Sequence, residues 1–342
     1  MPCRGTARSA VPQLVAAVVM GSTEESKDAM SEAPRDAESP GTSWSFTHRL
    51  GTTGQSRLTV LIVSWNSWHH LQPCLSSIGR STFLDHDVLV IDNASGDGTP
   101  EHLAREFPAV HVVQNRENLG HTRAVNQGLI KVQSEMIMVL DADTELAENA
   151  IETMVRFLDD HPEVDLVAPR TFNTDGTIQE SARNFPTAMS GLFGRQSHFT
   201  RLFPNNPFSR RYLMRAHIDA AAPFRVESIA SSCMLMRKSV VSRQGTWDEG
   251  FRGYFVETDW CYRLKRSGIQ IYCVPASHVV HHEGNNHKRK RDARRIWMFH
   301  AGALRFYRKN CTLGRYDPRT WFAAMALSVR AGVLIAQNAL KR

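Results

Sequence analysis

Short apolar runs alternate with helix-like segments between residues 58 and 141. The runs 58–63, 88–91 and 136–140 are continuous and rich in Val, Ile, Leu and Met, as expected of strands that are buried on both faces. Segments with helical spacing are predicted at residues 70–78, 100–107 and within 118–132. Strands that alternate with helices indicate an α/β fold, here a doubly wound, mainly parallel sheet with helices on both faces.

Polar side chains follow three of the predicted strands directly. They are Ser64 and Asn66, Asp92 and Asn93, and Asp141 and Asp143. In a doubly wound sheet the carboxyl ends of the parallel strands meet at one edge, and ligands bind in the crevice outside that edge. We therefore expect these side chains to lie together and to form a binding site.

Two carboxylates, Asp141 and Asp143, stand one residue apart at the last of these strand ends. Side chains two residues apart on an extended strand point the same way, so the two acids can converge on one point. Without a counter-charge one of the two pKa values would rise strongly, whereas a divalent cation removes that penalty. Oxygen ligands in an open site suit Mg²⁺ or Mn²⁺, with substrate phosphates as further ligands. A solvated turn, or a cap for a helix within 144–158, is the alternative that spacing alone leaves open.

Composition narrows the class of protein. The 342 residues are 42% hydrophobic, enough for the core of a large globular domain, and the formal net charge is +7. A positive balance favours an anionic partner such as a phosphate-bearing substrate, a nucleic acid or an acidic membrane surface, without choosing among them. The six cysteines are scattered without Cys-x-x-Cys spacing, so we expect reduced thiols in a cytosolic protein rather than zinc or disulfide chemistry.

Three regions are predicted along the chain. Residues 1–56 are rich in Ser, Glu, Pro and Ala without apolar periodicity, a composition typical of a disordered tail. The apolar run 11–20 is too short for a convincing signal peptide, and a start of translation at a later methionine is an equal alternative. The main folded domain is expected to span 57–284, followed by a basic and helical C-terminal extension, 285–342.

Five segments together carry a resemblance that no single motif would carry. In chain order they read TVLIVSWNS, VLVIDNASGDGT, NRENLGHTRAVNQGL, MVLDADTEL and GTWDEGFRGYFVETDWCYRLKRSGIQIYCVPASHVVHHEG. Over about residues 58–310 the chain resembles the family 2 inverting glycosyltransferases, whose catalytic domain has the GT-A fold. The segments DGTIQESARNFP and WMFHAGALRFYRKN are most similar to bacterial rhamnosyltransferase-type enzymes of cell-surface polysaccharide assembly. The resemblance implies a nucleotide-diphosphate sugar donor, with dTDP-rhamnose as one candidate, and a glycan or lipid-linked acceptor.

The resemblance also implies which residues bind the donor. The implied nucleotide-sugar pocket comprises Ser64, Trp65, Asn66, Asp92, Asn118, Gly120, Arg123 and Asp141. In such enzymes the residue matched by Asp92 accepts a hydrogen bond from the nucleobase. Gly120 allows a close backbone approach to the ligand, and Arg123 can pair with a diphosphate. A plain turn glycine and a solvated helix face are the respective alternatives.

The segment VETDW, which is similar to an acidic run of the family, implies the catalytic base. Glu257 falls where the base aspartate normally lies and Asp259 where the second acid lies, while Val256 replaces the usual first acid. Both acids could approach an acceptor hydroxyl, and we favour Glu257 as the base. A helix cap, or an ion pair with Arg263, is the alternative for Asp259.

A histidine completes the implied metal site. Relatives use a histidine six residues after the proline of VPASHVVHHEG, which is His281, so His282 is the neighbour to exclude. The resemblance thus implies that Asp143, Asp141 and His281 bind the metal, Mg²⁺ or Mn²⁺, with Asp143 as the main ligand. Asp141 is also expected to face the sugar or ribose of the donor. A neutral imidazole suits Mn²⁺ better than Mg²⁺.

The C-terminal extension raises the question of further partners. Residues 285–295 form a basic cluster without interleaved aromatic residues or a nucleic-acid-binding motif, so nucleic acid is not expected, whereas a solvated face and an anionic membrane surface both stay open. Apolar residues recur at helical spacing over 322–340, where Arg330 interrupts the run. We expect a helix that packs on the domain or lies on a membrane surface, rather than one that crosses it. The protein is then cytoplasmic, either free or peripheral at the inner face of the plasma membrane.

Three function classes follow from these observations. The favoured one is an inverting glycosyltransferase of cell-wall, lipopolysaccharide or exopolysaccharide synthesis. The second is a nucleotide-sugar-binding protein without turnover, because the VETDW run is irregular. The third is a sugar-phosphate nucleotidyltransferase, which would normally show a glycine-rich phosphate loop with a basic residue after the first strand; SWNSWHHLQPC lacks one.

Overall fold

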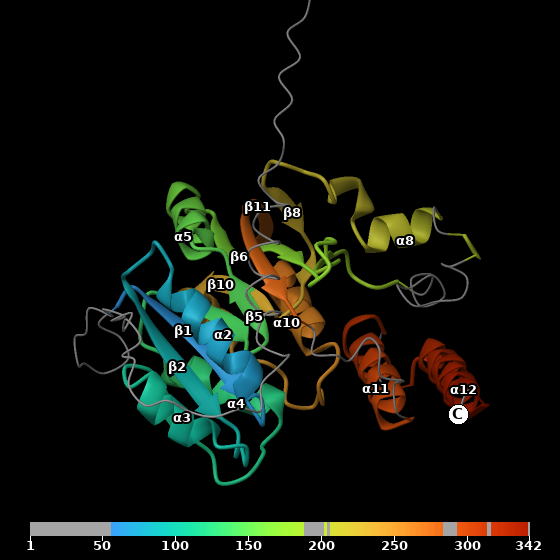
Figure 1. Ribbon diagram of the computed structural model, residues 1–342. Helices are drawn as coiled ribbons and strands as arrows, with labels where there is room; N and C mark the ends of the chain where they lie inside the picture. The colour runs from blue at the N-terminus through green and yellow to red at the C-terminus, as the bar shows by residue number, and fades with distance from the viewer. Residues whose placement is uncertain (1–55, 188–201, 204–205, 283–292, 313–315, 341–342) are drawn as a thin grey trace, which may run out of the picture.

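The computed structural model describes residues 56–187, 202–203, 206–282, 293–312 and 316–340. Its centre is a nine-stranded sheet in the order β3-β2-β1-β4-β10-β6-β11-β5, with β8 paired to β11 (Figure 1). The strands of this sheet are β1 (Leu58–Ser64), β2 (His86–Asp92), β3 (His111–Gln114), β4 (Met136–Asp141), β5 (Thr144–Leu146), β6 (Val164–Phe172), β8 (Phe224–Val226), β10 (Cys233–Arg237) and β11 (Gln270–His281). A separate two-stranded sheet consists of β7 (Ala182–Arg183) and β9 (Ser228–Ile229).

Helices flank the sheet, and a helical pair follows it at the C-terminal end (Figure 1). The α-helices are α2 (Trp68–Gly79), α3 (Thr99–Glu106), α4 (His121–Lys131), α5 (Ala150–Asp160), α8 (Pro207–Tyr212), α9 (Lys238–Gln244), α10 (Val256–Arg266), α11 (Ala293–Asn310) and α12 (Pro318–Leu340), and a 3₁₀ turn, η1, spans Arg215–His217. Every strand and helix predicted between residues 58 and 141 is present.

The sheet is parallel where the sequence predicts it to be. Strand β1 pairs in parallel with β2 and with β4, and β2 pairs in parallel with β3. Beyond β4 the sheet is mixed, because β10 lies antiparallel between β4 and β6, while β11 runs parallel to β6 and antiparallel to β5 and β8. The predicted fold class is therefore confirmed, as a mixed and mostly parallel sheet between helices.

Two hydrophobic cores lie on the two faces of this sheet. Val60 and Ile62 of β1 belong to the core that includes α2 and α5, whereas Leu61 belongs to the core that includes α4 and α10. Because both faces are covered, the strands need apolar residues at every position, which explains the continuous runs in the sequence. Four free cysteines are buried in these cores, Cys74, Cys233, Cys261 and Cys273, as expected of reduced thiols.

The C-terminal helices α11 and α12 lie at the lower right of Figure 1. Helix α11 contacts α10, and α12 packs mainly on α11. The helix predicted over 322–340 is present, but most of its apolar side chains are not buried against the domain. Residues 1–55 of the predicted tail 1–56, and residues 285–292 of the basic cluster 285–295, lie outside the described residues, so both assignments stay predictions.

Candidate functional site

The ends of β1 and β2 bring the first polar residues together. Ser64 and Asp92 are register partners at the carboxyl ends of the two parallel strands. The backbone N–H of Asn93 donates to the carbonyl of Ser64 at 2.8 Å, which fixes the two chain segments where they leave the sheet. The parallel register with β4 places the end of that strand at the same edge. The expected gathering of strand ends is therefore confirmed.

Asp141 and Asp143 lie on either side of a sharp change in chain direction. Asp141 is the last residue of β4, Asp143 belongs to a turn, and β5 begins at the next residue. The backbone N–H of His282 donates to the carbonyl of Asp143 at 2.8 Å, so the turn is tied to β11. The expectation of one extended strand through both acids is wrong, and so is the alternative that they cap a helix, because α5 begins only at Ala150.

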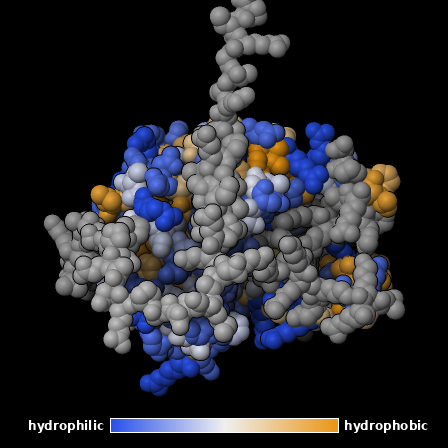
Figure 2. Space-filling model, in the orientation of Figure 1, coloured by the Kyte–Doolittle hydropathy of each residue, from blue (hydrophilic) through white to orange (hydrophobic). Residues whose placement is uncertain are grey.

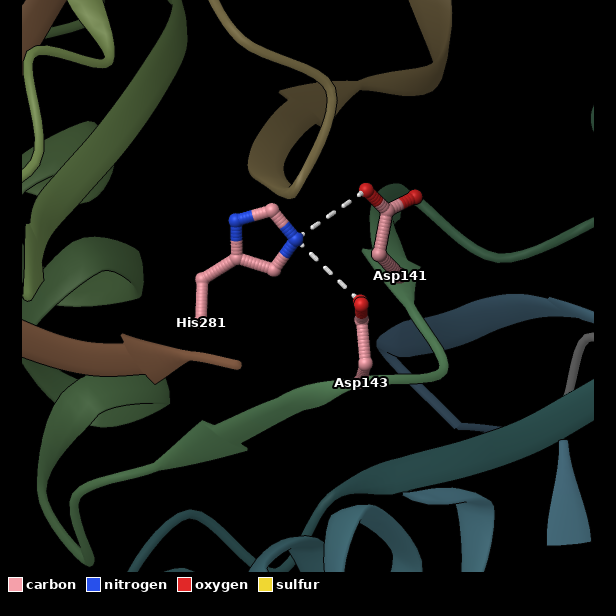
Figure 3. A group of neighbouring side chains, drawn as sticks. All are labelled: Asp141, Asp143 and His281. Carbon is pink, nitrogen blue, oxygen red and sulfur yellow. Dashed lines mark ion pairs between the residues drawn. The ribbon is translucent and has the colours of Figure 1, made fainter. Parts of the chain in front are cut away.

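A cluster of three side chains forms at this turn. The Nε2 atom of His281 lies 3.2 Å from Oδ1 of Asp143 and 3.9 Å from Oδ2 of Asp141, and the three side chains point toward one another (Figure 3). The three candidate ligand atoms lie within 4.8 Å of one another. Each side chain is only partly exposed, at 25% for the two acids and 12% for His281. Antiparallel pairing explains the convergence, because His281 of β11 is the register partner of Thr144 beside the turn.

The two acids of the cluster have pKa values shifted in opposite directions. Burial raises the pKa of Asp141, and the charge of Asp143 adds to this effect against the opposing influence of His121 and His281. Burial also opposes ionisation of Asp143, but a hydrogen bond and charge from His281, together with His70, lower its pKa overall. Asp143 is therefore the more readily ionised of the two and the better anionic ligand.

Gln179 contacts the ring of His281, and no local sequence pattern indicates this role. Its Oε1 atom lies 2.9 Å from Nδ1 of His281, and the side chain is 5% exposed. An amide oxygen can only accept, so Nδ1 carries the proton. In the imidazolium form Nε2 also carries a proton and donates it to Asp143, which is the hydrogen bond that lowers the pKa of that acid. In the neutral form Nε2 presents a lone pair that repels the two carboxylates unless a cation lies between them. Two carboxylates and an imidazole nitrogen are ligands that suit Mn²⁺, so the donor set fits the expected metal.

Replacing Gln179 with methionine should weaken Mn²⁺ binding about 10- to 100-fold, because the imidazole of His281 loses the acceptor that orients it. Gln179→Glu keeps an acceptor and should restore binding. Isothermal titration of Mn²⁺ measures both affinities. The matched control is Gln133→Met, which changes an exposed glutamine in the segment between α4 and β4. Equal affinity in the Gln179→Met variant and the wild type would contradict this role.

His282 faces a different partner from its neighbour. Its Nε2 atom lies 2.6 Å from Oε1 of Glu145, and its ring lies beside His70, with a centroid distance of 6.0 Å. Successive residues of a strand point to opposite faces, so His281 and His282 cannot both reach Asp143. The geometry is consistent with leaving His282 out of the ligand set.

Asp92 is a fully buried acid at the carboxyl end of β2. Its Oδ2 atom accepts from the backbone N–H of Ser95 at 3.1 Å, and the residue is 0% exposed. Within the part of the chain that the structure describes, Oδ1 of Asp92 is buried without a hydrogen-bond partner. A buried acceptor without a partner is costly in a folded protein, which marks this atom as a site for a ligand donor.

The loop after β1 lies beside Asp92. Asn66 has a left-handed backbone with φ of 49°, and two hydrogen bonds stabilise it: its N–H donates to Oγ of Ser95 at 2.9 Å and its Oδ1 accepts from Gly96 at 2.7 Å. The neighbouring Trp65 is 55% exposed and presents a large aromatic surface to solvent. Ser64 is buried, and its hydroxyl forms a hydrogen bond with that of Ser67 at the start of the loop.

The loop before α4 forms the next wall of the edge. Oδ1 of Asn118 accepts from Nδ2 of Asn93 at 2.9 Å and from the N–H of Gly120 at 2.8 Å. Gly120 has a φ of 84° with open space where a Cβ would lie, so glycine is needed for the backbone shape. Arg123 is exposed and pairs with Glu249 at 3.1 Å, an interaction that a diphosphate would have to replace.

Glu257 and Asp259 have different surroundings in α10. Glu257 is half-buried near the N-terminus of the helix; burial raises its pKa, and the charge of Asp141 acts in the same direction against Arg183 and His121. Asp259 is 0% exposed. Its Oδ2 atom accepts from Lys309 at 2.8 Å and from Arg263 at 3.3 Å, and its Oδ1 accepts from Asn310 at 2.8 Å. The ion-pair alternative for Asp259 is therefore present, whereas Glu257 is the acid whose pKa the charge of Asp141 raises.

The model of glycosyl transferase family 2 matches residues 59–243, which is more than half of the chain. The chain belongs to this family. The matched region contains β1 to β10, and with them Asp92, Asp141 and Asp143. Family 2 membership makes the protein a glycosyltransferase, and it favours sugar transfer over the nucleotidyltransferase alternative.

Relatives of this family 2 glycosyltransferase act in glycan assembly. The chain is 25% identical over 297 residues to the N-acetylglucosaminyl-diphospho-decaprenol L-rhamnosyltransferase of Mycobacterium tuberculosis, covering 83% of this chain and 94% of the relative. It is 20% identical over 283 residues to a low-salt glycan biosynthesis hexosyltransferase of Haloferax volcanii, covering 81% and 83% of the two chains. The sequence comparison thus confirms that the chain is similar to a rhamnosyltransferase over most of its length.

A solved structure supports the GT-A fold of this family 2 member. The mannosyltransferase PcManGT from Pyrobaculum calidifontis, solved in complex with GDP-Man and Mn²⁺, superposes with a TM-score of 0.50 at 19% sequence identity. The match covers 97% of this chain and 81% of that chain, so it includes the C-terminal helices. The GT-A assignment of the sequence is therefore confirmed.

Proposed function

We propose that this glycosyltransferase moves a sugar from a nucleoside-diphosphate donor to an acceptor hydroxyl with inversion at the anomeric carbon. The observation that carries the proposal is the cluster of Asp141, Asp143 and His281 at the same sheet edge as Asp92. One arrangement thus offers a ligand set for a divalent cation and, close by, a buried acceptor for a nucleobase. The half-buried Glu257 completes it as a carboxylate for the acceptor.

On the donor side, Oδ1 of Asp92 accepts a hydrogen bond from the nucleobase, and Trp65 offers a flat apolar surface beside it. The loop with Asn118 and Gly120 approaches the ribose and diphosphate through its backbone. Arg123 turns from Glu249 to the diphosphate, which carries more negative charge than the single carboxylate that it replaces.

Asp143 and His281 would hold the cation, with Asp141 as a shared ligand that also faces the sugar or ribose. When bound, Mn²⁺ or Mg²⁺ supplies positive charge that stabilises the leaving nucleoside diphosphate. Gln179 keeps His281 in the tautomer that offers Nε2 to the site.

On the acceptor side, a carboxylate oxygen of Glu257 accepts the proton of the attacking hydroxyl. The hydroxyl oxygen forms a bond to the anomeric carbon from the face opposite to the diphosphate, and the bond to the diphosphate breaks. The raised pKa of Glu257 makes it a stronger base than an exposed glutamate. No residue of the chain is covalently modified in this scheme.

The relatives suggest the substrates. A rhamnosyl donor such as dTDP-rhamnose and a polyprenyl-diphosphate-linked acceptor fit the likeness to the mycobacterial enzyme. The site of action would be the cytoplasmic side of the plasma membrane, where nucleotide-sugars and lipid-linked acceptors meet, and the product would enter cell-wall or other surface polysaccharide.

A panel of nucleotide-sugars tested by thermal shift, with and without Mn²⁺, identifies the donor. Only the true donor should raise Tm, and only with metal, because binding to the native state alone stabilises it by about 2.7 kcal/mol at a ligand concentration of 100 Kd. Asp92→Asn should weaken the shift for that donor. A shift of equal size without metal would contradict the proposed site, and a shift without release of nucleoside diphosphate would indicate a binding protein.

A further inference from the structure

Helix α12 turns its apolar side chains to solvent. Five large apolar residues lie along one side of it, Trp321, Phe322, Met325, Val329 and Val333, with exposed fractions between 50% and 73%. We refer to these five residues as the α12 apolar face. Hydrophobic side chains are visible at the lower right of Figure 2, where Figure 1 draws α12. An exposed apolar face of this length on a soluble protein marks an interaction site.

The opposite side of α12 is the one that packs on the protein. Thr320 and Ala331 are buried there, and Leu327, Arg330 and Leu334 are half-buried. The charged Arg330 near the middle of the helix thus lies toward the protein, while the outward side between Trp321 and Val333 has no charged residue. This is the reverse of the arrangement in an ordinary surface helix.

The charges of α11 and α12 indicate the class of partner. Neither helix contains an Asp or a Glu. Their basic residues are Arg294, Arg295, Arg305, Arg308, Lys309, Arg319 and Arg330. Arg294, Trp297 and Arg308 are exposed on α11, so a half-exposed tryptophan stands between two exposed cations. Tryptophan and basic side chains are the residues that favour a membrane–water interface with anionic lipids.

We propose that α11 and α12 dock on the surface of an anionic lipid bilayer, with the α12 apolar face inserted at the level of the headgroups and acyl chain ends. A helix in this position lies in the plane of the membrane, with its apolar side in the lipid. Among the described residues, α12 is the one helix whose length and composition would allow it to cross a membrane. A crossing would place Arg330 near the centre of the hydrocarbon and separate α12 from α11, so the in-plane position fits better.

A second copy of the chain is the less favourable occupant. A symmetric dimer pairs a surface with itself, so the cations of α11 and α12 would face the same cations of the other copy. Arg305 and Lys309 already pair with Asp248 and Asp259, and Arg319 pairs with Asp317. The exposed Arg294 and Arg308 are therefore the cations that would repel those of a second copy. Anionic lipid headgroups meet the same cations with attraction.

The docked helices would lie next to the acceptor side of the site. Helix α11 approaches the loop before Glu257 so closely that a Cβ on Gly302 would lie 2.7 Å from the carbonyl oxygen of Tyr254. The rings of Phe255 and Phe299 lie 5.3 Å apart in the same contact. The inference deepens the proposed function by naming the surface that brings the enzyme to a lipid-linked acceptor. Its test involves no transfer reaction, so either can fail without the other.

Vesicle flotation of the full chain tests the inference. The wild type should float with phosphatidylcholine vesicles that contain about 30 mol% phosphatidylglycerol, and bind pure phosphatidylcholine about tenfold more weakly. The triple variant Phe322→Gln/Met325→Gln/Val329→Gln should lose about tenfold or more in the partition coefficient, since it removes three apolar anchors. Arg294→Gln/Arg308→Gln should remove the preference for phosphatidylglycerol. Leu84→Gln/Ile130→Gln, which changes two equally exposed apolar residues on other elements, should bind as the wild type does.

Several results would overturn the inference. One is flotation of the triple variant that equals the wild type; another is absence of wild-type flotation. A wild-type dimer in sedimentation velocity that the triple variant converts to monomers, without vesicle binding, would assign the α12 apolar face to a second copy. Binding that resists both high salt and alkaline carbonate would indicate a crossing helix instead. Circular dichroism checks that each variant keeps its fold.

Discussion

Replacing Glu257 with glutamine is expected to lower kcat for sugar transfer about 10²- to 10⁴-fold, the usual range for loss of a general base. The amide has nearly the same shape but cannot take the proton from the acceptor hydroxyl. Donor affinity and Tm should stay near the wild-type values, because glutamine keeps the size and shape of the glutamate side chain. A stopped or quenched assay of nucleoside diphosphate release at saturating donor and acceptor gives kcat directly.

The pH profile of the wild type provides a second readout for Glu257. A base must be ionised, so transfer should fall as the pH falls through the pKa of Glu257. Burial and the charge of Asp141 raise that pKa, so the acidic limb should lie at a higher pH than an exposed glutamate would give. The Glu257→Gln variant should lack this limb.

Asp259 provides the matched comparison for Glu257, two residues away on the same helix. Asp259→Asn should chiefly destabilise the protein, by about 3 kcal/mol, because it removes the charge that pairs with Lys309 and Arg263 at a buried position. Its kcat at a temperature where it is folded should stay within about tenfold of the wild type. The opposite pattern, with chemistry lost in Asp259→Asn and kept in Glu257→Gln, would transfer the role of base to Asp259.

Asp143→Ala should abolish measurable transfer and lower Mn²⁺ affinity by at least about a hundredfold. Asp143 has the lower pKa of the two acids and lies 3.2 Å from His281, so its loss leaves one partly buried acid with a raised pKa as the remaining carboxylate. Isothermal titration with Mn²⁺ measures the affinity, and product formation against metal concentration measures the activity.

Two controls make the Asp143 result specific. Asp175→Ala changes a carboxylate in the turn before β7 and should change neither quantity. Wild-type enzyme in excess EDTA should behave like the Asp143→Ala variant. Turnover at the wild-type rate by Asp143→Ala in excess EDTA would rule out the metal role.

Local sequence was sufficient for the parallel half of the fold. The apolar runs that form β1, β2 and β4 are buried on both faces of the sheet. A short continuous apolar run is therefore enough to predict each of these strands. The gathering of Ser64, Asp92 and Asp141 at one edge then follows from the rule for parallel sheets. Nothing beyond these strand ends was needed to expect a ligand site there.

The local pattern of apolar and polar residues could not predict which distant segments of the chain come into contact. The segment after Asp143 has a helix-like composition, but it forms β5 because β11 offers a free edge for pairing. Gln179 and His281 are 102 residues apart, and Asp259 and Lys309 are 50 apart, so only the folded chain shows that they meet. The period of 322–340 predicted the helix α12 but not which side of it would face solvent.

The hydrogen bonds between α10 and α11 limit which parts of this chain could be exchanged with a relative. Asp259 is fully enclosed by partners that include Lys309 and Asn310, residues far beyond position 243, where the family match ends. A recombination that exchanged the C-terminal helices for those of a relative would leave Asp259 without these partners unless α10 changed in step. The structural unit of this chain therefore extends to at least residue 310, and an exchange of α11 should include α10.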